Sequence, residues 1–153
     1  MSAASAADAA ARLREQFGCE PVVDGTVVTV PLALQQWQAA GRFARAQLGC
    51  VFFNFLTAID WKEQGIEILC RVDNLEARLA LMLRTTLSPG ADHCPSLTGV
   101  WRGANWMERE CWDMFGVRFD GHPDPRRILL EEDWDGHPLR KDYAVDTAHT
   151  PYR

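Results

Sequence analysis

Two stretches near the start of the chain have the three- to four-residue spacing of hydrophobic positions that is typical of amphipathic helices. The first covers residues 8–17, and Gly18 ends it. The second covers residues 31–48, where Pro31 suits a first helical turn and Gly49 suits the residue after the last turn. Its hydrophobic stripe consists of Leu34, Trp37, Gly41, Ala44 and Leu48. We therefore predict two helices before residue 50.

Strand-like alternation follows in residues 51–59, 66–72 and 77–85, where hydrophobic and polar side chains take turns along most of each segment. Earlier in the chain, Asp24-Gly25 stands between two valine-rich runs, which is typical of a β-hairpin. These segments predict an α+β fold with a mostly antiparallel sheet of about four strands. One face of the sheet is expected to be polar and the other covered by helices, chiefly the helix at 31–48.

Two further helices are predicted after residue 90. Pro95 suits the start of a short helix that runs to Trp101, and a longer helix covers residues 104–115 and ends at Gly116. The hydrophobic stripe of the longer helix consists of Met107, Cys111, Met114 and Phe115. The opposite side is expected to carry Glu108, Arg109, Glu110 and Asp113, and the four-residue spacing of Arg109 and Asp113 favours an ion pair between them.

The last part of the chain has no sustained helical or strand-like spacing. After Phe119 the only apolar run is Ile128-Leu129-Leu130, and prolines and glycines interrupt the segment. With so few apolar side chains, this segment is expected to be disordered or to be held by a partner. We therefore predict a globular domain over residues 1–117 and an extended C-terminal arm over residues 118–153 that packs on a partner subunit.

Composition narrows the class of protein. The 153 residues suffice for one domain, and the net charge of −5 argues against nucleic acid as the main partner. No apolar run reaches the length of about 20 residues that a membrane span needs, and the N-terminus does not have the pattern of a signal peptide. The five cysteines are widely spaced and contain no C-x-x-C, so they are expected to be buried thiols rather than disulfides or metal ligands.

Two kinds of functional site are compatible with the C-terminal half. Carboxylates and histidines there could form an acid–base or metal site, and a stand-alone metal-dependent enzyme would use Glu110, His122 and His137. Their spacing matches no known metal motif, and the chain contains no phosphate-binding loop. The alternative is a protein interface, because four of the six tryptophans lie near Arg126-Arg127 and Arg140-Lys141. Tryptophan and arginine are enriched at interface hot spots.

The segment from 108 to 143 also resembles the signature of a known family, the 30 kDa subunit of respiratory complex I, an NADH:quinone oxidoreductase. The first block of the signature consists of Glu108, Arg109, Glu110, Asp113, Gly116, His122 and Pro123. The second block consists of Arg126, Arg127, Ile128, Leu129, Trp134 and the run Gly136-His137-Pro138-Leu139-Arg140-Lys141-Asp142-Tyr143. One departure is Ala144, where the family usually has proline.

This resemblance implies a subunit without a redox centre, so that catalytic, cofactor-binding and metal-binding residues are not expected on this chain. It implies a place in the hydrophilic arm of a proton-pumping enzyme, peripheral on the cytoplasmic side of the cell membrane. The expected partners are the 49 kDa-type quinone-site subunit and a neighbouring iron–sulfur subunit, in a complex that carries FMN, iron–sulfur clusters and quinone. An equivalent subunit of a membrane-bound hydrogenase or a ferredoxin-dependent relative remains open.

Within the arm, the resemblance implies a group of residues that contact the partner. These are Arg126, Arg127, Trp134, His137, Arg140, Lys141, Asp142 and Tyr143. Glu108, Arg109, Glu110 and Asp113 are expected to organise the departure of the arm from the domain.

Overall fold

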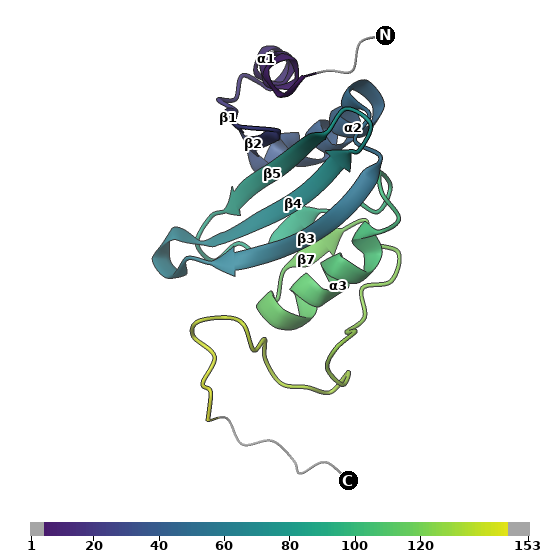
Figure 1. Cartoon of the computed structure of the whole chain (residues 1–153). Helices are drawn as coiled ribbons and strands as arrows, with labels where there is room; N and C mark the ends of the chain where they lie inside the picture. The colour runs from purple at the N-terminus through teal and green to yellow at the C-terminus, as the bar shows by residue number, and fades with distance from the viewer. Residues whose placement is uncertain (1–4, 147–153) are drawn as a thin grey trace.

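The computed structural model describes residues 5–146 and forms an α+β domain followed by an irregular tail (Figure 1). The helices are α1 (Ala6–Phe17), α2 (Trp37–Leu48) and α3 (Ala104–Phe115), with short 3₁₀ turns η1 (Leu34–Gln36) and η2 (Lys62–Gln64). The strands are β1 (Val22–Asp24), β2 (Val27–Pro31), β3 (Phe52–Asp60), β4 (Ile66–Asn74), β5 (Leu79–Leu87), β6 (His93–Pro95) and β7 (Arg118–Asp120).

The main sheet has five strands in the order β1-β2-β5-β4-β3, and β6 and β7 form a separate parallel pair. The α+β class and the mostly antiparallel sheet are confirmed, but the prediction of about four strands was wrong. The predicted hairpin at Asp24-Gly25 is present, and its second strand continues the sheet by pairing in parallel with β5. Alternation along the sequence identifies strands, whereas this parallel pairing joins segments about fifty residues apart and leaves no local signal.

The core lies between the helices and the hydrophobic row of the sheet. Inward positions of β4 and β5, such as Ile68 and Leu83, are buried in this core, where α2 packs on β5 and α3 packs on β3. Trp101 is also buried, and its indole Nε1–H donates to the carbonyl oxygen of Cys50 at 3.0 Å. All five cysteines are free thiols in buried positions. Burial raises the pKa of the Cys50 thiol to about 12, so it behaves as a small apolar side chain.

Three element predictions need correction. The helix expected at 31–48 begins at Trp37, because Pro31 ends β2 and residues 34–36 form η1. The short helix expected from Pro95 to Trp101 does not form, because Pro95 ends β6, where it pairs with Asp120 of β7. The polar groups of the next two residues then bond to a side chain of α3 instead of to a helical turn. The strand expected at 77–85 runs from Leu79 to Leu87, since the turn after β4 occupies residues 75–78.

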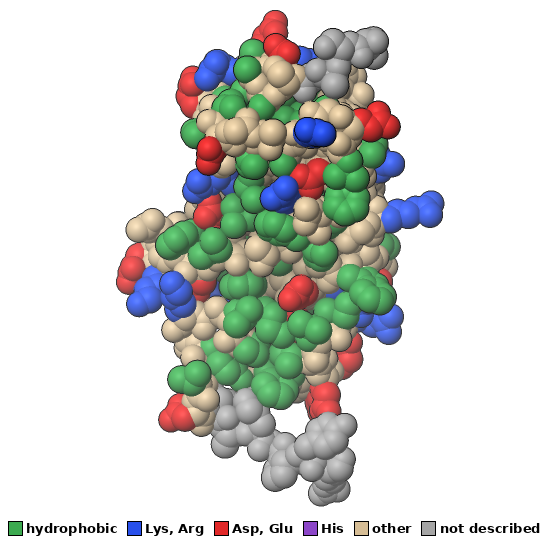
Figure 2. All heavy atoms as spheres, in the orientation of Figure 1, with side chains coloured by type: hydrophobic (Ala, Val, Ile, Leu, Met, Phe, Trp, Pro, Cys, Tyr) green, Lys and Arg blue, Asp and Glu red, His purple; other side chains and the backbone are tan. Residues whose placement is uncertain are grey.

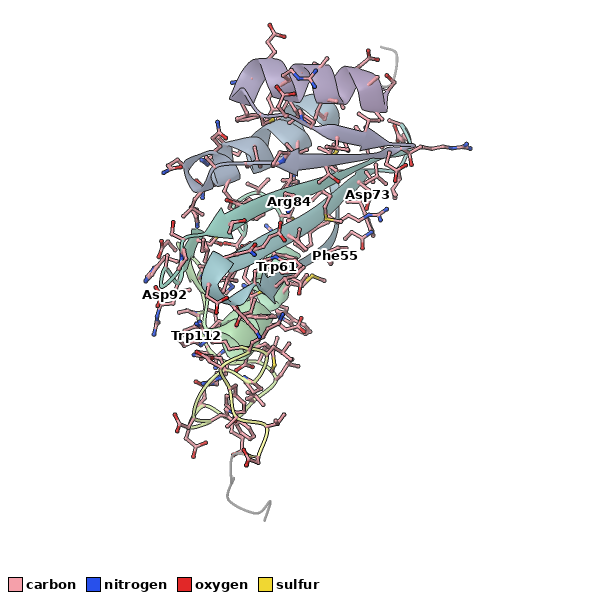
Figure 3. The ribbon with its side chains drawn as sticks, turned by 90° about the vertical axis from the view of Figure 1, so that its left-hand side faces the viewer. Phe55, Trp61, Asp73, Arg84, Asp92 and Trp112 are labelled. Carbon is pink, nitrogen blue, oxygen red and sulfur yellow. The ribbon has the colours of Figure 1, made fainter. Side chains whose placement is uncertain are left out.

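The tail leaves the domain after β7 and runs along the end of α3 without regular structure (Figure 1). Residues 118–120 belong to the folded domain, because β7 is paired with β6. Figure 3 shows Trp112 on α3 beside the tail, and Trp61 where the chain leaves β3. Within the described residues, no helix is long and apolar enough to cross a membrane. The part of the predicted arm at 147–153 lies outside the described residues.

Candidate functional site

The site with the densest polar contacts is the surface where α3 meets the tail, which we call the α3–tail junction and define as residues 105–116 and 121–143. At its centre, Asp113 is 0 % exposed. One carboxylate oxygen accepts a hydrogen bond from Arg127 at 2.9 Å. The other accepts three backbone N–H groups at 2.6–3.1 Å, those of Ile128, Leu129 and Leu130. One side chain of the helix therefore fixes the only apolar run of the tail.

The environment of Asp113 keeps it ionised. Burial alone would raise the pKa of this carboxyl. The hydrogen bonds from Arg127 and from the three backbone N–H groups outweigh burial, and the net pKa lies below the usual range. A negative charge that is enclosed by N–H donors in this way is stabilised without contact with water.

Arg127 is the matching group on the tail, and its side chain is 9 % exposed. Besides the carboxylate of Asp113, its guanidinium donates to the carbonyl oxygens of Trp134 and Gly136 at 2.9 and 3.0 Å. Arg127 thus connects the helix to a second part of the tail and closes the loop between residues 127 and 136. Its planar array of donors suits this task better than the single ammonium of a lysine would.

Arg109 lies one turn before Asp113 on α3 and also binds the tail. Its guanidinium donates to the carbonyl oxygens of Arg126 and Arg127 at 2.9 and 2.8 Å. The expected ion pair between Arg109 and Asp113 is not formed, because each side chain has partners on the tail instead. Together the two residues hold positions 126–130 of the tail against the domain.

The carbonyl groups at the C-terminal end of α3 are also satisfied by the tail. His137 Nδ1 is 3.0 Å from the carbonyl oxygen of Asp113, Leu139 N–H donates to Met114, and Arg140 donates to Phe115. The last carbonyls of a helix have no partner inside the helix, so these contacts replace water there. The tail therefore acts as a cap for α3.

Gly116 permits this arrangement. It ends α3 with φ +74°, and a Cβ atom built on it would lie 2.7 Å from the ring of His137. The ring of His137 packs in turn against Trp112, with 4.9 Å between ring centroids. The signature glycine is thus required both for its left-handed backbone and for the close approach of the histidine.

The two Gly-His-Pro sequences have parallel uses. His122 Nε2 is 2.9 Å from the carbonyl oxygen of Asn105 near the start of α3, and its Nδ1 accepts the backbone N–H of Asp124. His137 binds the carbonyl of Asp113 near the other end of α3. Pro123 is exposed beside the first of them. Each histidine therefore attaches a turn of the tail to the backbone of the same helix.

The end of the described tail returns to the sheet. Lys141 N–H donates to the carboxylate of Asp60 at 2.9 Å, and the Lys141 ammonium lies over the ring of Trp61 at 5.8 Å. The hydrogen bond from Lys141 is the main cause that lowers the pKa of Asp60. The side chain of Asp142 is 3.5 Å from Arg140. Sequence reasoning missed Asp60, because its partner lies 81 residues away.

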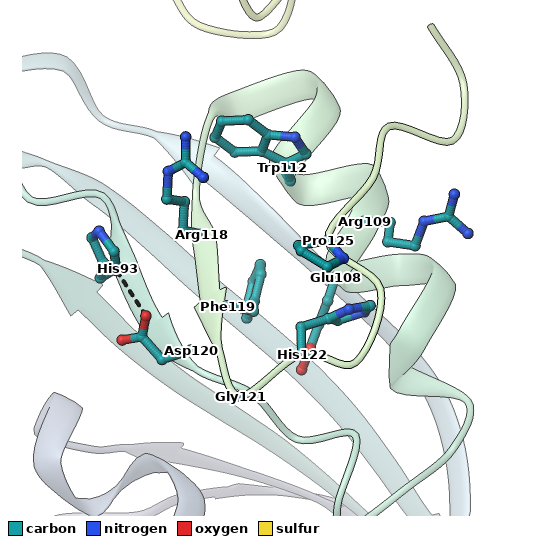
Figure 4. Close-up of a pocket in the computed structure, with 10 residues that line it drawn as sticks. All are labelled: His93, Glu108, Arg109, Trp112, Arg118, Phe119, Asp120, Gly121, His122 and Pro125. Carbon is teal, nitrogen blue, oxygen red and sulfur yellow. Dashed lines mark hydrogen bonds and ion pairs between the residues drawn. The ribbon is translucent and has the colours of Figure 1, made fainter. Parts of the chain in front are cut away.

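A pocket of about 250 Å³ adjoins the junction (Figure 4). Helix α3 contributes Glu108, Arg109 and Trp112, and β7 contributes Arg118, which lies over the Trp112 ring at 4.2 Å. Glu108 was expected on the exposed side of α3, yet it is buried. Its spacing from Cys111 and Phe115, three and seven residues, does place it on the hydrophobic stripe, and this was the signal that the sequence offered.

The structure does not support a metal site. The described residues contain no group of three or more histidine, cysteine or carboxylate side chains arranged to hold a metal ion. Both ring nitrogens of His122 have backbone partners, and His137 bonds a helix carbonyl. Glu110 is exposed on α3. The two histidines of the metal hypothesis thus each hold a backbone group of α3, and the described residues do not gather them with Glu110 into a metal-binding group.

Comparison with known proteins identifies the family of this chain. The family model of the respiratory-chain NADH dehydrogenase, 30 Kd subunit, matches residues 30–149, which include the whole α3–tail junction. The chain belongs to this family. It is 38 % identical over 147 residues to the C subunit of the NADH-quinone oxidoreductase of Chlorobium phaeobacteroides, covering 90 % of this chain and 87 % of that one.

Members of the family also occur within longer chains. The C/D subunit of the NADH-quinone oxidoreductase of Phocaeicola vulgatus is 40 % identical over 103 residues, which are 67 % of this chain and 20 % of that one. Among solved structures, a membrane-bound sulfane sulfur reductase, described as an archaeal respiratory membrane complex, contains a chain of the same fold. Its TM-score is 0.76 at 21 % identity, with 91 % of this chain and 85 % of that chain covered.

Proposed function

We propose that this chain is a structural subunit of the hydrophilic arm of a proton-pumping NADH:quinone oxidoreductase. Its task is to dock on neighbouring subunits and to hold them in position, so that electrons pass from NADH to quinone through cofactors that the other subunits carry. The family membership supports the enzyme. The observation that carries the docking role is the α3–tail junction, which fixes an irregular segment so that its outer side faces solvent.

The side chains on the outer side of the junction suit a protein partner. Leu129 and Leu139 are 60 % and 53 % exposed although they stand between partly buried residues, and Trp106 on α3 is also largely exposed. Figure 2 shows hydrophobic side chains gathered over α3 and the adjoining tail. Exposed apolar patches often mark interaction sites, and tryptophan and arginine are enriched at protein interfaces.

The proposed partner residues divide into three groups by their place in the structure. Arg126 has a side chain that is 69 % exposed, and Lys141 and Asp142 are exposed as well, so these are available to a partner. Arg127 and His137 bind α3 and act by shaping the surface. Trp134, Arg140 and Tyr143 are half-buried and complete the set that we assign to the interface.

The proposed partners are the 49 kDa-type quinone-site subunit and a neighbouring iron–sulfur subunit, on the cytoplasmic side of the membrane. The existence of a C/D relative supports a close neighbour, because a C-type segment and a D-type segment share one chain there. FMN, iron–sulfur clusters and quinone belong to other subunits in this proposal. Residues 121–153 serve as the arm that packs on the partner.

A second candidate is the equivalent subunit of a membrane-bound hydrogenase or a ferredoxin-dependent relative. The observation that favours it is the shared fold with a chain of the sulfane sulfur reductase complex. The two candidates use the same docking surface and differ in the enzyme to which it belongs.

Affinity purification of the tagged chain from its native host in mild detergent tests both candidates. Mass spectrometry and an NADH-oxidation assay follow on the purified material. Recovery of flavin, iron–sulfur and quinone-site subunits together with activity supports the first candidate. Recovery of nickel–iron hydrogenase subunits supports the second, and recovery of the chain alone contradicts both.

A further inference from the structure

The carboxylate of Glu108 lies inside the domain, and its partners are neutral. The residue is 1 % exposed. One carboxylate oxygen accepts the backbone N–H of Leu97 at 2.6 Å, and the other accepts the hydroxyl of Ser96 at 2.7 Å. The salt bridges formed by the described residues do not include Glu108, and the neighbouring Arg109 is directed to the tail. A buried carboxylate without a cation is costly in its ionised form.

The hydroxyls around Glu108 can serve its ionised form and its protonated form equally well. Ser96 Oγ is 2.7 Å from Thr98 Oγ1, where either oxygen can be the donor, and it also accepts the backbone N–H of Thr98. With Glu108 ionised, Ser96 donates to it and accepts from the Thr98 hydroxyl. With Glu108 protonated, its O–H donates to Ser96, and Ser96 donates to Thr98. Glu108 and Ser96 therefore keep their hydrogen-bond partners in both states.

Thr98 connects this chain of hydroxyls to solvent. It is only partly buried, and it lines an open hollow of about 350 Å³ whose walls include Arg45 and Arg102. A proton reaches Glu108 when a solvent acid protonates Thr98 Oγ1, the Thr98 hydroxyl proton passes to Ser96 Oγ, and the Ser96 proton passes to the carboxylate. Each hydroxyl oxygen gains one O–H bond and loses one, and the carboxylate keeps the proton.

The groups that face Glu108 from the neighbouring elements do not supply a compensating charge. Burial raises the pKa of the thiols that approach it from β4, β6 and α3 itself, so they are neutral; these are Cys70, Cys94 and Cys111. The pocket on the other side is lined by charged or titratable side chains with partners of their own. They are His93 with Asp120, Arg118 with Trp112, Arg109 with the tail, and His122 with Asn105.

We propose that Glu108 is a proton-binding site of this chain, which exchanges its proton with solvent through the hydroxyls of Ser96 and Thr98. Burial supports the assignment, because it raises the pKa of the carboxyl to about 7, against the opposing effect of the hydrogen bonds from Leu97 and Ser96. The proposal does not depend on which enzyme complex the chain joins.

The full chain with ¹³C-labelled glutamate carboxyl groups tests the site by NMR between pH 4 and pH 9. We expect one carboxyl resonance to titrate with a midpoint near pH 7. That resonance should be absent from Glu108→Gln and present in the matched control Glu110→Gln, which changes an exposed residue of the same helix. A Glu108 midpoint below pH 5.5 would overturn the site. If Glu108→Gln does not fold, contacts of the label with Leu97 N–H provide the assignment.

Two further variants test the route of the proton. Thr98→Val removes the outer hydroxyl and keeps the backbone N–H that bonds Ser96, so we expect the midpoint to stay in place and proton exchange to slow by about a hundredfold. Ser96→Ala removes the middle hydroxyl of the route and with it a hydrogen-bond donor to the Glu108 carboxylate. Proton exchange should therefore slow, and the titration midpoint of Glu108 should rise. Exchange at the wild-type rate in Thr98→Val would show that the proton does not pass through this hydroxyl.

Discussion

The carboxylate of Asp113 and the guanidinium of Arg127 meet at 2.9 Å where α3 joins the tail, and both side chains are almost fully shielded from solvent. The two residues are 14 positions apart in the sequence, and one belongs to a helix packed on the sheet while the other belongs to a segment without regular structure. A buried pair of this kind adds little net free energy when intact. Loss of one partner is costly, because the other charge is then left uncompensated.

Replacing Asp113 tests whether this pair holds the tail. Asp113→Asn keeps the size of the side chain but leaves Arg127 buried without its counter-charge and weakens three backbone hydrogen bonds. We expect the free energy of unfolding to fall by about 3 kcal/mol and trypsin to cleave the tail faster at its basic residues. Urea unfolding and timed proteolysis measure the two effects. Asp133→Asn, at an exposed tail position, should change neither, and equal sensitivity of both variants would contradict the role of the pair.

The helix at 104–115 could be predicted with its correct ends, since helical spacing and Gly116 are local signals. The contacts that this helix makes with the tail could not be predicted from the sequence. Arg109 and Asp113 are well placed for each other by spacing, but partners from the tail compete successfully because they bring several donors and acceptors at once. Three of those donors are backbone N–H groups, which every sequence contains and which therefore give no pattern.

For the tail, too, the sequence predicted the lack of regular structure and did not predict the contacts. Its composition indicates a segment without a core of its own, and the described part indeed lacks regular structure. The side chains that hold it, chiefly Asp113 and Asp60, lie on the domain far away in the sequence. Resemblance to the family predicts that Arg127 contacts a partner, and it gave no sign that this side chain is bonded inside the chain.

Gly116 should be intolerant of a side chain for two separate reasons, which a second glycine can separate. Gly116→Ala introduces a methyl group into a backbone with φ +74° and directly against the His137 ring. Gly121→Ala introduces the same strain at φ +86° with open space around the new atom. We expect a loss of about 1 kcal/mol from strain in both and of roughly 1 kcal/mol more in Gly116→Ala. Thermal unfolding of both variants measures the difference, and equal losses would show that His137 moves aside freely.

The stability of the chain should depend on pH through Glu108 in a defined window. Its pKa is raised from 4.5 in the unfolded chain to about 7 in the folded one, so between these values the folded state binds the extra proton. The contribution of Glu108 to the free energy of unfolding is therefore fully present below pH 4.5 and is lost as pH rises through 7. The loss amounts to at most about 3 kcal/mol.

Comparison of the wild type with Glu108→Gln isolates this dependence, because the amide does not titrate. Urea unfolding at intervals from pH 5 to pH 8 should show the wild type losing stability relative to the variant as pH rises. The carboxylates whose pKa is lowered, including Asp113 and Asp60, lose their contribution only as pH falls, so they act outside this window. A constant difference between the two proteins across the range would rule out titration of Glu108 there.

The two neighbouring arginines of the tail should differ in how much they contribute to the stability of the isolated chain. Arg127→Ala removes a largely buried side chain that bonds Asp113, Trp134 and Gly136, so unfolding of the isolated chain should become easier by about 3 kcal/mol. Arg126→Ala removes an exposed side chain whose polar contacts are with Asp124, two residues earlier, so the unfolding free energy should change by less than about 0.5 kcal/mol.

Arg126 should matter for assembly although it matters little for stability, because its exposed side chain is available to a partner. We expect Arg126→Ala to fold normally and to recover fewer partner subunits from the native host by affinity purification, with less NADH-oxidation activity per tagged chain. A leucine at the same position would restore any purely apolar contact and should not restore recovery, whereas lysine should restore it in part. Full recovery of the complex with Arg126→Ala would place the docking contacts elsewhere on the tail and remove this residue from the interface.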